Sequence, residues 1–144
     1  VIRFSYEEPA SVTVINRTHA RTLALAERVY EKTGFKIETE AGLDSYDVII
    51  NTTSAGMAPK LDILPTDAID GVDVIDLINE NTAAVDMIYN PEETLFLKEA
   101  KRRGAKIMNG LGMLIYQGII AYELFTDTKL SDDIYDCIRE EVFG

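Results

Sequence analysis

The chain has 144 residues, 47% of them hydrophobic and 27% charged, a composition typical of a packed globular domain and unlike that of disordered or fibrous chains. Its formal net charge of −11 repels polyanions, so nucleic acid is a poor partner. One cysteine and one histidine exclude a disulfide scaffold and a His-rich metal site, and no apolar run approaches the roughly 20 residues of a membrane helix. We therefore expect a single cytoplasmic domain over residues 1–144, with no metal and no membrane contact.

Short apolar runs rich in β-branched residues alternate with helical patterns along the chain. The runs predict strands at residues 12–15, 35–39, 46–51, 83–87 and 106–108. Helices are predicted at residues 19–32, 92–103, 112–125 and 131–142, and residues 58–81 are expected to hold a loop with a short helix or strand. This alternation is typical of an α/β protein with a mostly parallel sheet.

Single residues at the helix ends and on the helix faces carry further predictions. Thr18 is expected to cap the first helix and Gly34 to end it. Cys137 lies on a helical stripe of apolar residues, which predicts a buried thiol. His19 is predicted to be a solvated surface imidazole rather than a ligand or catalytic base.

The first candidate site follows the strand predicted at residues 12–15. Asn16, Arg17 and Thr18 would lie at its carboxyl end, where open α/β sheets bind ligands. In a dinucleotide fold an acidic residue at this point would contact the ribose 2′-hydroxyl of NAD, whereas Arg17 suits a 2′-phosphate, with Arg21 one helical turn later. Taken alone, the two arginines are better explained as ordinary solvated surface residues, and only the wider context favours the phosphate site.

Three further segments, together with the triplet at residues 16–18, give the chain a family resemblance. In chain order the four segments read NRT at 16–18, DVIINTTSAGM at 47–57, DMIYNP at 86–91 and NGLGMLIYQ at 109–117. Each is weak by itself, but all four, in this order and at compatible spacing, resemble the NADP-binding half of shikimate dehydrogenases. The resemblance implies a doubly wound, Rossmann-like parallel sheet.

The resemblance also implies roles for single residues. NADP would be held by Asn16, Arg17, Thr18, Arg21, Asn51, Thr52, Thr53, Ser54, Met87, Gly110 and Met113. Tyr89 and Gln117 would contact a hydroxy-acid substrate. Without the resemblance, residues 51–54 would be interpreted as a polar turn after a strand and the methionines as core residues. Gly110 would be a glycine needed for steric reasons at the start of a helix. Tyr89 would be a packing residue and Gln117 a residue on a helix surface.

Two parts of the resembled family have no counterpart in the sequence. The first strand and the glycine-rich loop that receives the pyrophosphate are absent, as is the amino-terminal substrate domain with its Lys and Asp acid/base pair. We therefore expect no catalytic residue in this chain, which alone should be close to inactive. We expect it to be the partial NADP-binding domain of a longer polypeptide, with carboxyl-terminal helices over residues 112–142.

The function implied by the resemblance is the NADP-dependent interconversion of 3-dehydroshikimate and shikimate, in chorismate and aromatic amino acid biosynthesis. The expected partners are this small-molecule substrate and the missing substrate domain, in a monomer or a homodimer. Two alternatives remain open. One is a quinate/shikimate dehydrogenase that uses NAD or NADP, and the other is a degenerate, non-catalytic nucleotide-binding or interaction domain.

Overall fold

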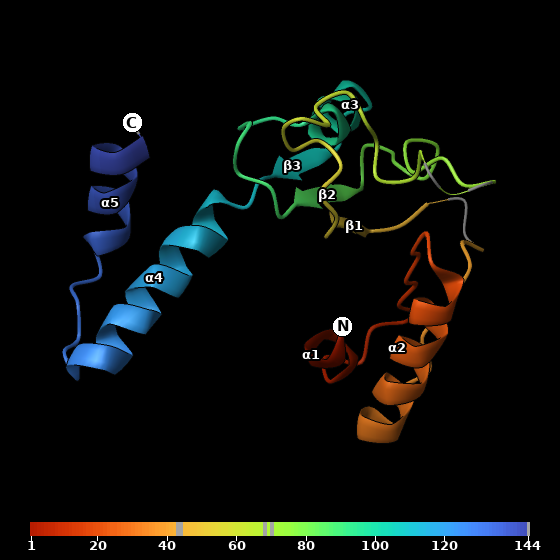
Figure 1. The fold of residues 1–144 in the computed structure, drawn as a ribbon, viewed down its shortest axis with the longest axis horizontal. Helices are drawn as coiled ribbons and strands as arrows, with labels where there is room; N and C mark the ends of the chain where they lie inside the picture. Colours follow the sequence, from red (N-terminus) through yellow and green to blue (C-terminus); the bar gives the residue numbers. More distant parts are fainter. Residues whose placement is uncertain (43–44, 68, 70, 144) are drawn as a thin grey trace. The chain divides into compact units, whose positions relative to one another are not determined.

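The computed structural model describes residues 1–42, 45–67, 69 and 71–143, which are drawn as a ribbon in Figure 1. The chain divides into two compact units. The first unit comprises Val1–Ser45 and Thr66–Leu77, and the second comprises Tyr46–Pro65 and Ile78–Gly144. A single functional domain over residues 1–144 stays a prediction, and the two units are described one at a time.

The second unit contains a three-stranded parallel sheet in the order β1-β2-β3 (Figure 1). Strand β1 spans Val48–Asn51, β2 spans Ala83–Asp86 and β3 spans Lys106–Met108. Ala83 of β2 is in register with Val48 on one side and with Lys106 on the other. Three predicted strands and their parallel pairing are thus confirmed, and the α/β Rossmann-like class with them.

Helix α3, Leu95–Arg102, joins β2 to β3 and packs against both strands. Its buried side chains are Phe96, Leu97 and Ala100, which have helical spacing on one face and form part of the core. The Thr94 hydroxyl caps the helix by accepting a hydrogen bond from the Leu97 amide at 3.4 Å. The helix therefore begins at residue 95 and not at residue 92 as predicted, because the capping side chain lies after the Asn90–Pro91 segment.

Helices α4, Leu111–Thr126, and α5, Ile134–Phe143, end the second unit and lie side by side (Figure 1). Both were predicted, but the burial predicted for Cys137 is wrong, because its thiol is exposed. Helix α5 meets only α4 among the described elements, through Ile134, Ile138 and Tyr135, whose ring stacks on that of Tyr116. A helical stripe predicts a face, but burial also needs a partner that covers the whole face.

The first unit contains α1, Ile2–Ser5, and α2, His19–Thr33. Gly34 ends α2 as predicted, with φ of 72° and its amide bonded to the Tyr30 carbonyl at 2.8 Å. Thr18 holds the N-cap position, but its side chain makes no capping hydrogen bond. The Thr18 amide instead donates to Asn16 Oδ1 at 2.9 Å.

The strands predicted at residues 12–15 and 35–39 do not form a regular ladder. They meet in one parallel bridge between Thr13 and Glu38, where the Val14 amide donates to the Glu38 carbonyl at 2.9 Å and the Glu38 amide to the Val12 carbonyl at 2.8 Å. The residue types suit strands, but a strand is defined by repeated pairing, and here each segment pairs at a single point.

The described residues between 58 and 81 form turns and bends with neither helix nor strand, so the short element predicted there is wrong for this part of the chain. Pro59 and Pro65 interrupt the backbone amide ladder that such an element would need. In the described part of the chain, no helix is both long enough and apolar enough to cross a bilayer.

Candidate functional site

A hollow of about 440 Å³ lies in the first unit, next to the amino-terminal end of α2. We call it the arginine hollow and define it by its lining residues, which are Ile15, Asn16, Arg17, His19, Thr39, Glu40, Ala41, Ile69 and Val72. Asn16 and Arg17 were predicted cofactor contacts, and the hollow brings them together with segments more than 20 and more than 50 residues away in the sequence. No sequence pattern indicated that these distant segments lie beside Asn16 and Arg17.

The arginine hollow is suited to bind an anion through Arg17, but it also contains the negatively charged Glu40. Arg17 offers a permanently charged donor fork, and the exposed His19 is the first residue of α2, whose unpaired amides carry a favourable dipole. Exposure of His19 confirms the prediction of a solvated imidazole. Glu40 lines the same hollow and would repel an anion, while Arg21 is not among the lining residues. An anion in this hollow would thus meet Arg17 as its strongest partner and Glu40 as its opponent.

In the second unit, a buried carboxylate lies where β2 ends. Asp86 is fully buried, and its two carboxylate oxygens each lie 3.1 Å from Asn51 Nδ2 at the end of β1. The Ile88 amide donates to Asp86 Oδ1 at 3.0 Å, and the Thr94 hydroxyl donates to Asp86 Oδ2 at 2.7 Å. The Ile88 amide is a local partner of Asp86, whereas Asn51 and Thr94 come from other segments of the chain. We call Asn51, Asp86 and Thr94 the strand-end network.

The strand-end network continues into the loop that follows β1. Asn51 Oδ1 accepts from the Thr53 amide at 2.9 Å and from the Thr53 hydroxyl at 2.8 Å, and Asn51 Nδ2 donates to the Ala55 carbonyl at 3.2 Å. Asn51 is only 3% exposed, whereas Thr52, Thr53 and Ser54 are exposed. Asn51 therefore shapes this loop from within, and its neighbours present the loop's polar surface.

Gly110 occupies a position where no side chain fits. A Cβ atom built there would lie 2.0 Å from the Met87 carbonyl oxygen, far inside the contact distance of real atoms. The Gly110 amide donates to the Ile88 carbonyl at 3.0 Å, and the Gly110 carbonyl accepts from the Leu114 amide at 3.0 Å. The close approach supports the steric reason for this glycine, and a carbonyl oxygen with two lone pairs keeps one free for a ligand.

The remaining residues predicted to bind cofactor or substrate lie on the surface of the second unit. Met87, Tyr89 and Met113 are exposed, as is Gln117, whose Nε2 donates to the Leu114 carbonyl at 3.0 Å. Met87 follows β2 directly, and its amide donates to the Asn51 carbonyl at 3.1 Å. The structure thus places Asn51, Met87 and Gly110 together at the carboxyl ends of successive strands.

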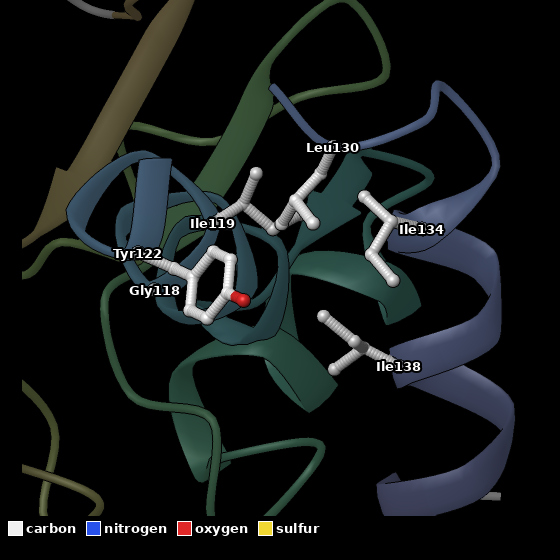
Figure 2. A pocket seen from close by; sticks show the side chains of 6 residues that line it. All are labelled: Gly118, Ile119, Tyr122, Leu130, Ile134 and Ile138. Carbon is white, nitrogen blue, oxygen red and sulfur yellow. The ribbon is translucent and has the colours of Figure 1, made fainter. Parts of the chain in front are cut away.

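A second hollow, of about 370 Å³, lies between α4 and α5 (Figure 2). It is lined almost wholly by carbon, from Gly118, Ile119, Tyr122, Leu130, Ile134 and Ile138. The side chains of Leu130, Ile134 and Ile138 gather on one side of it in Figure 2. None of the predicted cofactor or substrate residues lines this hollow, and its lining presents almost no polar surface to a ligand.

Among the described residues, no cluster of His, Cys, Asp and Glu could hold a metal ion.

The chain is similar in sequence to shikimate dehydrogenases. Residues 110–143, which hold α4 and α5, match the family model described as the shikimate 5′-dehydrogenase C-terminal domain. A shikimate dehydrogenase (NADP⁺) of Methanocaldococcus jannaschii is 38% identical over 135 residues, which is 89% of this chain and 46% of that protein. The chain spans about half the length of the curated relatives it matches.

Solved structures agree with the sequence comparison. A crystal structure of a shikimate dehydrogenase in complex with NADP⁺ matches with a TM-score of 0.76 at 35% identity, over 93% of this chain and 47% of that one. The enzyme of Thermus thermophilus, in complex with NADP(H) and shikimate, matches with a TM-score of 0.69 at 30% identity, over 94% and 48% of the two chains. The matched part is again about half of each solved chain.

Proposed function

We propose that this chain, which resembles shikimate dehydrogenases over about half of their length, is the NADP-binding part of an oxidoreductase that interconverts 3-dehydroshikimate and shikimate. The observation that carries this proposal is the position of Asn51, Met87 and Gly110, which end or follow successive parallel strands. This edge is where open α/β sheets bind their ligands.

The arginine hollow fits the 2′-phosphate end of NADP. Arg17, with Asn16 and Thr18 beside it, would hold the phosphate through charge-assisted hydrogen bonds, and Arg21 would add to the positive field at the start of α2. Glu40 in the same hollow would moderate the affinity without removing the preference, because the guanidinium is permanently charged and can bind the phosphate through two hydrogen bonds.

The edge of the sheet in the second unit fits the nicotinamide end. The lack of a side chain at Gly110 lets its backbone lie directly against the Met87 carbonyl, and Met87 and Met113 offer polarizable apolar surface. Thr52, Thr53 and Ser54 would contact the ribose side through exposed hydroxyls and amides, and the buried Asn51 would hold their loop in place. Tyr89 and Gln117 would orient the hydroxy acid. The bound cofactor supplies hydride transfer.

Proton transfer requires a group that we place outside this chain. Asp86 is the buried carboxylate at the edge of the sheet, and its hydrogen bonds to Asn51, Ile88 and Thr94 occupy both of its oxygens. We therefore propose that the acid/base pair and most substrate contacts come from a separate substrate domain, and that this chain alone is close to inactive. Exposed apolar residues on α4, such as Leu124 and Phe125, support a covering partner.

The proposal is tested with the full-length natural gene product. We expect NADP-dependent oxidation of shikimate, followed by the absorbance of NADPH, at a rate well above that with quinate or with NAD. A preference for quinate would favour the quinate dehydrogenase alternative. Absence of activity with both substrates and both cofactors would favour the non-catalytic alternative. The monomeric or homodimeric state and the cytoplasmic location stay predictions.

A further inference from the structure

The strand-end network is built around the Asp86 carboxylate, which forms no ion pair with any residue that the structure describes. Asp86 is fully buried, and its hydrogen-bond partners in the described part of the chain are an amide side chain, a hydroxyl and a backbone amide. A buried charge without a counterion is costly unless several donors surround it. Each donor therefore stabilises the buried carboxylate, and the carboxylate in turn fixes the position of each donor.

The donors to Asp86 come from three different segments. Asn51 ends β1 and begins the loop of residues 51–55, Ile88 belongs to the segment after β2, and Thr94 begins α3. The Ile88 carbonyl in turn accepts from the Gly110 amide at 3.0 Å, which ties the start of α4 to the same point. One carboxylate thus fixes the loops that leave β1 and β2, and through Ile88 it also reaches Gly110.

We propose that Asp86 and Thr94 are positioning residues, which hold the loops of residues 51–55 and 87–89 in place and thereby set the affinity for the nicotinamide nucleotide. This inference rests on the proposed function. Neither side chain needs to touch the cofactor. They act through the Asn51 amide group, which shapes the first loop, and through the Ile88 amide, which fixes the second.

The Thr94 side chain allows polar positioning to be separated from packing. Its hydroxyl donates to Asp86 and also caps α3 by accepting from the Leu97 amide, whereas its methyl group would lie 3.1 Å from a Cβ built on Gly56. Thr94→Val keeps the shape and removes the hydroxyl, and Thr94→Ser keeps the hydroxyl and removes the methyl group. Thr126→Val is a matched control, because the Thr126 hydroxyl is exposed and donates only to the Tyr122 carbonyl of its own helix.

The experiment uses the full-length protein and two readouts. For Thr94→Val we expect the KM and the dissociation constant for NADP to rise about tenfold, as for the loss of one hydrogen bond to a charged group, with a smaller change in kcat. We expect Thr94→Ser and Thr126→Val to stay within about twofold of wild type. Amide exchange should accelerate at Thr53 and Ile88 in Thr94→Val, and remain unchanged at Lys106 of β3, whose amide donates to the Thr82 carbonyl.

The outcomes separate the two proposals. Loss of kcat at an unchanged KM would mean that less protein is folded, and would overturn the positioning role. Equal damage from Thr94→Ser and Thr94→Val would assign the effect to packing and would also overturn it. If wild type binds no NADP and oxidises no shikimate, the proposed function fails and the nucleotide part of the inference fails with it. Unchanged exchange at Thr53 and Ile88 would overturn the loop positioning by itself, whatever the protein binds.

Discussion

The arginine hollow and the strand-end network are two polar regions with opposite character. The hollow is open, and its charged residues Arg17 and Glu40 are exposed, as is His19. The strand-end network is buried, and Asp86 and Asn51 are 0% and 3% exposed. Exposed charges at the hollow remain available to a ligand, whereas the buried polar groups of the network are already occupied by one another.

This difference in exposure predicts how each region responds to substitution. A change in the arginine hollow should alter what binds and leave the free energy of unfolding nearly constant, because solvent already screens these charges. A change at the strand-end network or at the adjacent Gly110 should alter the stability, because the lost contacts have no solvent to replace them. The following substitutions test this contrast.

Gly110→Ala should have the largest effect. Its Cβ would meet the Met87 carbonyl oxygen, a backbone atom that cannot rotate away, so we expect a loss of about 3 to 5 kcal/mol in the free energy of unfolding. Urea denaturation of the full-length protein measures it. Gly118→Ala is the control, since a Cβ there meets nothing within 4 Å and alanine favours helix by about 0.5 to 1 kcal/mol. Equal stability of the two variants would contradict the close packing at Gly110.

Arg17→Gln should weaken NADP binding by about tenfold or more, because a charge-assisted hydrogen bond to the 2′-phosphate is lost. NAD binding and the free energy of unfolding should stay near their wild-type values, since NAD lacks that phosphate. Titration calorimetry with both nucleotides measures the difference. Arg28→Gln removes an exposed cation elsewhere on α2 and should change neither affinity. Equal losses for NADP and NAD in Arg17→Gln would remove the 2′-phosphate assignment.

Glu40→Gln should strengthen NADP binding by about threefold, a typical value for one exposed charge interaction. The carboxylate lines the arginine hollow and opposes an anion there, so its removal should help NADP and leave NAD unchanged. The gain should shrink at high salt, which screens the repulsion. The same titrations at two salt concentrations measure it, and weaker binding of both nucleotides would instead mean that Glu40 contacts a part common to the two.

The smallest effect is expected at the end of α4. Lys129 Nζ lies 2.6 Å from Glu123 Oε2, and this hydrogen bond, with another from the Leu130 amide, lowers the pKa of the Glu123 carboxyl below its ordinary value. The pair therefore stabilises the fold above the ordinary pKa of glutamate, and this contribution disappears as the pH falls through the lowered pKa. Lys129→Gln should flatten the dependence of stability on pH in the acidic range.

Unfolding by urea at neutral and acidic pH measures this difference between Lys129→Gln and wild type. Lys36→Gln removes an exposed cation from the first unit and serves as the control. If both variants showed the same dependence on pH, the ion pair at Glu123 would contribute nothing measurable to the stability.

The elements with strong local patterns were predictable. Helix α2 begins at His19 and ends at Thr33, just before the glycine predicted to stop it, and β3 has the predicted bounds of residues 106–108. The segments at residues 12–15 and 35–39 have equally suitable residues but form only one bridge. The difference arises because helical hydrogen bonds are local to the segment, whereas strand hydrogen bonds depend on a neighbour that the segment's own residues do not specify.

By itself the sequence determined the α/β class and the resemblance to one enzyme family, because residue types, periodicity and motif order are properties of the linear chain. Only the tertiary structure decided that Asn51 and Asp86, 35 residues apart, share hydrogen bonds, that Glu40 opposes Arg17 in one hollow, and that Cys137 is exposed. Burial and hydrogen-bond partnership are set by which segments come together in space. Polar residues such as Asn51 and Asp86 therefore look the same in sequence whether they face solvent or a buried partner.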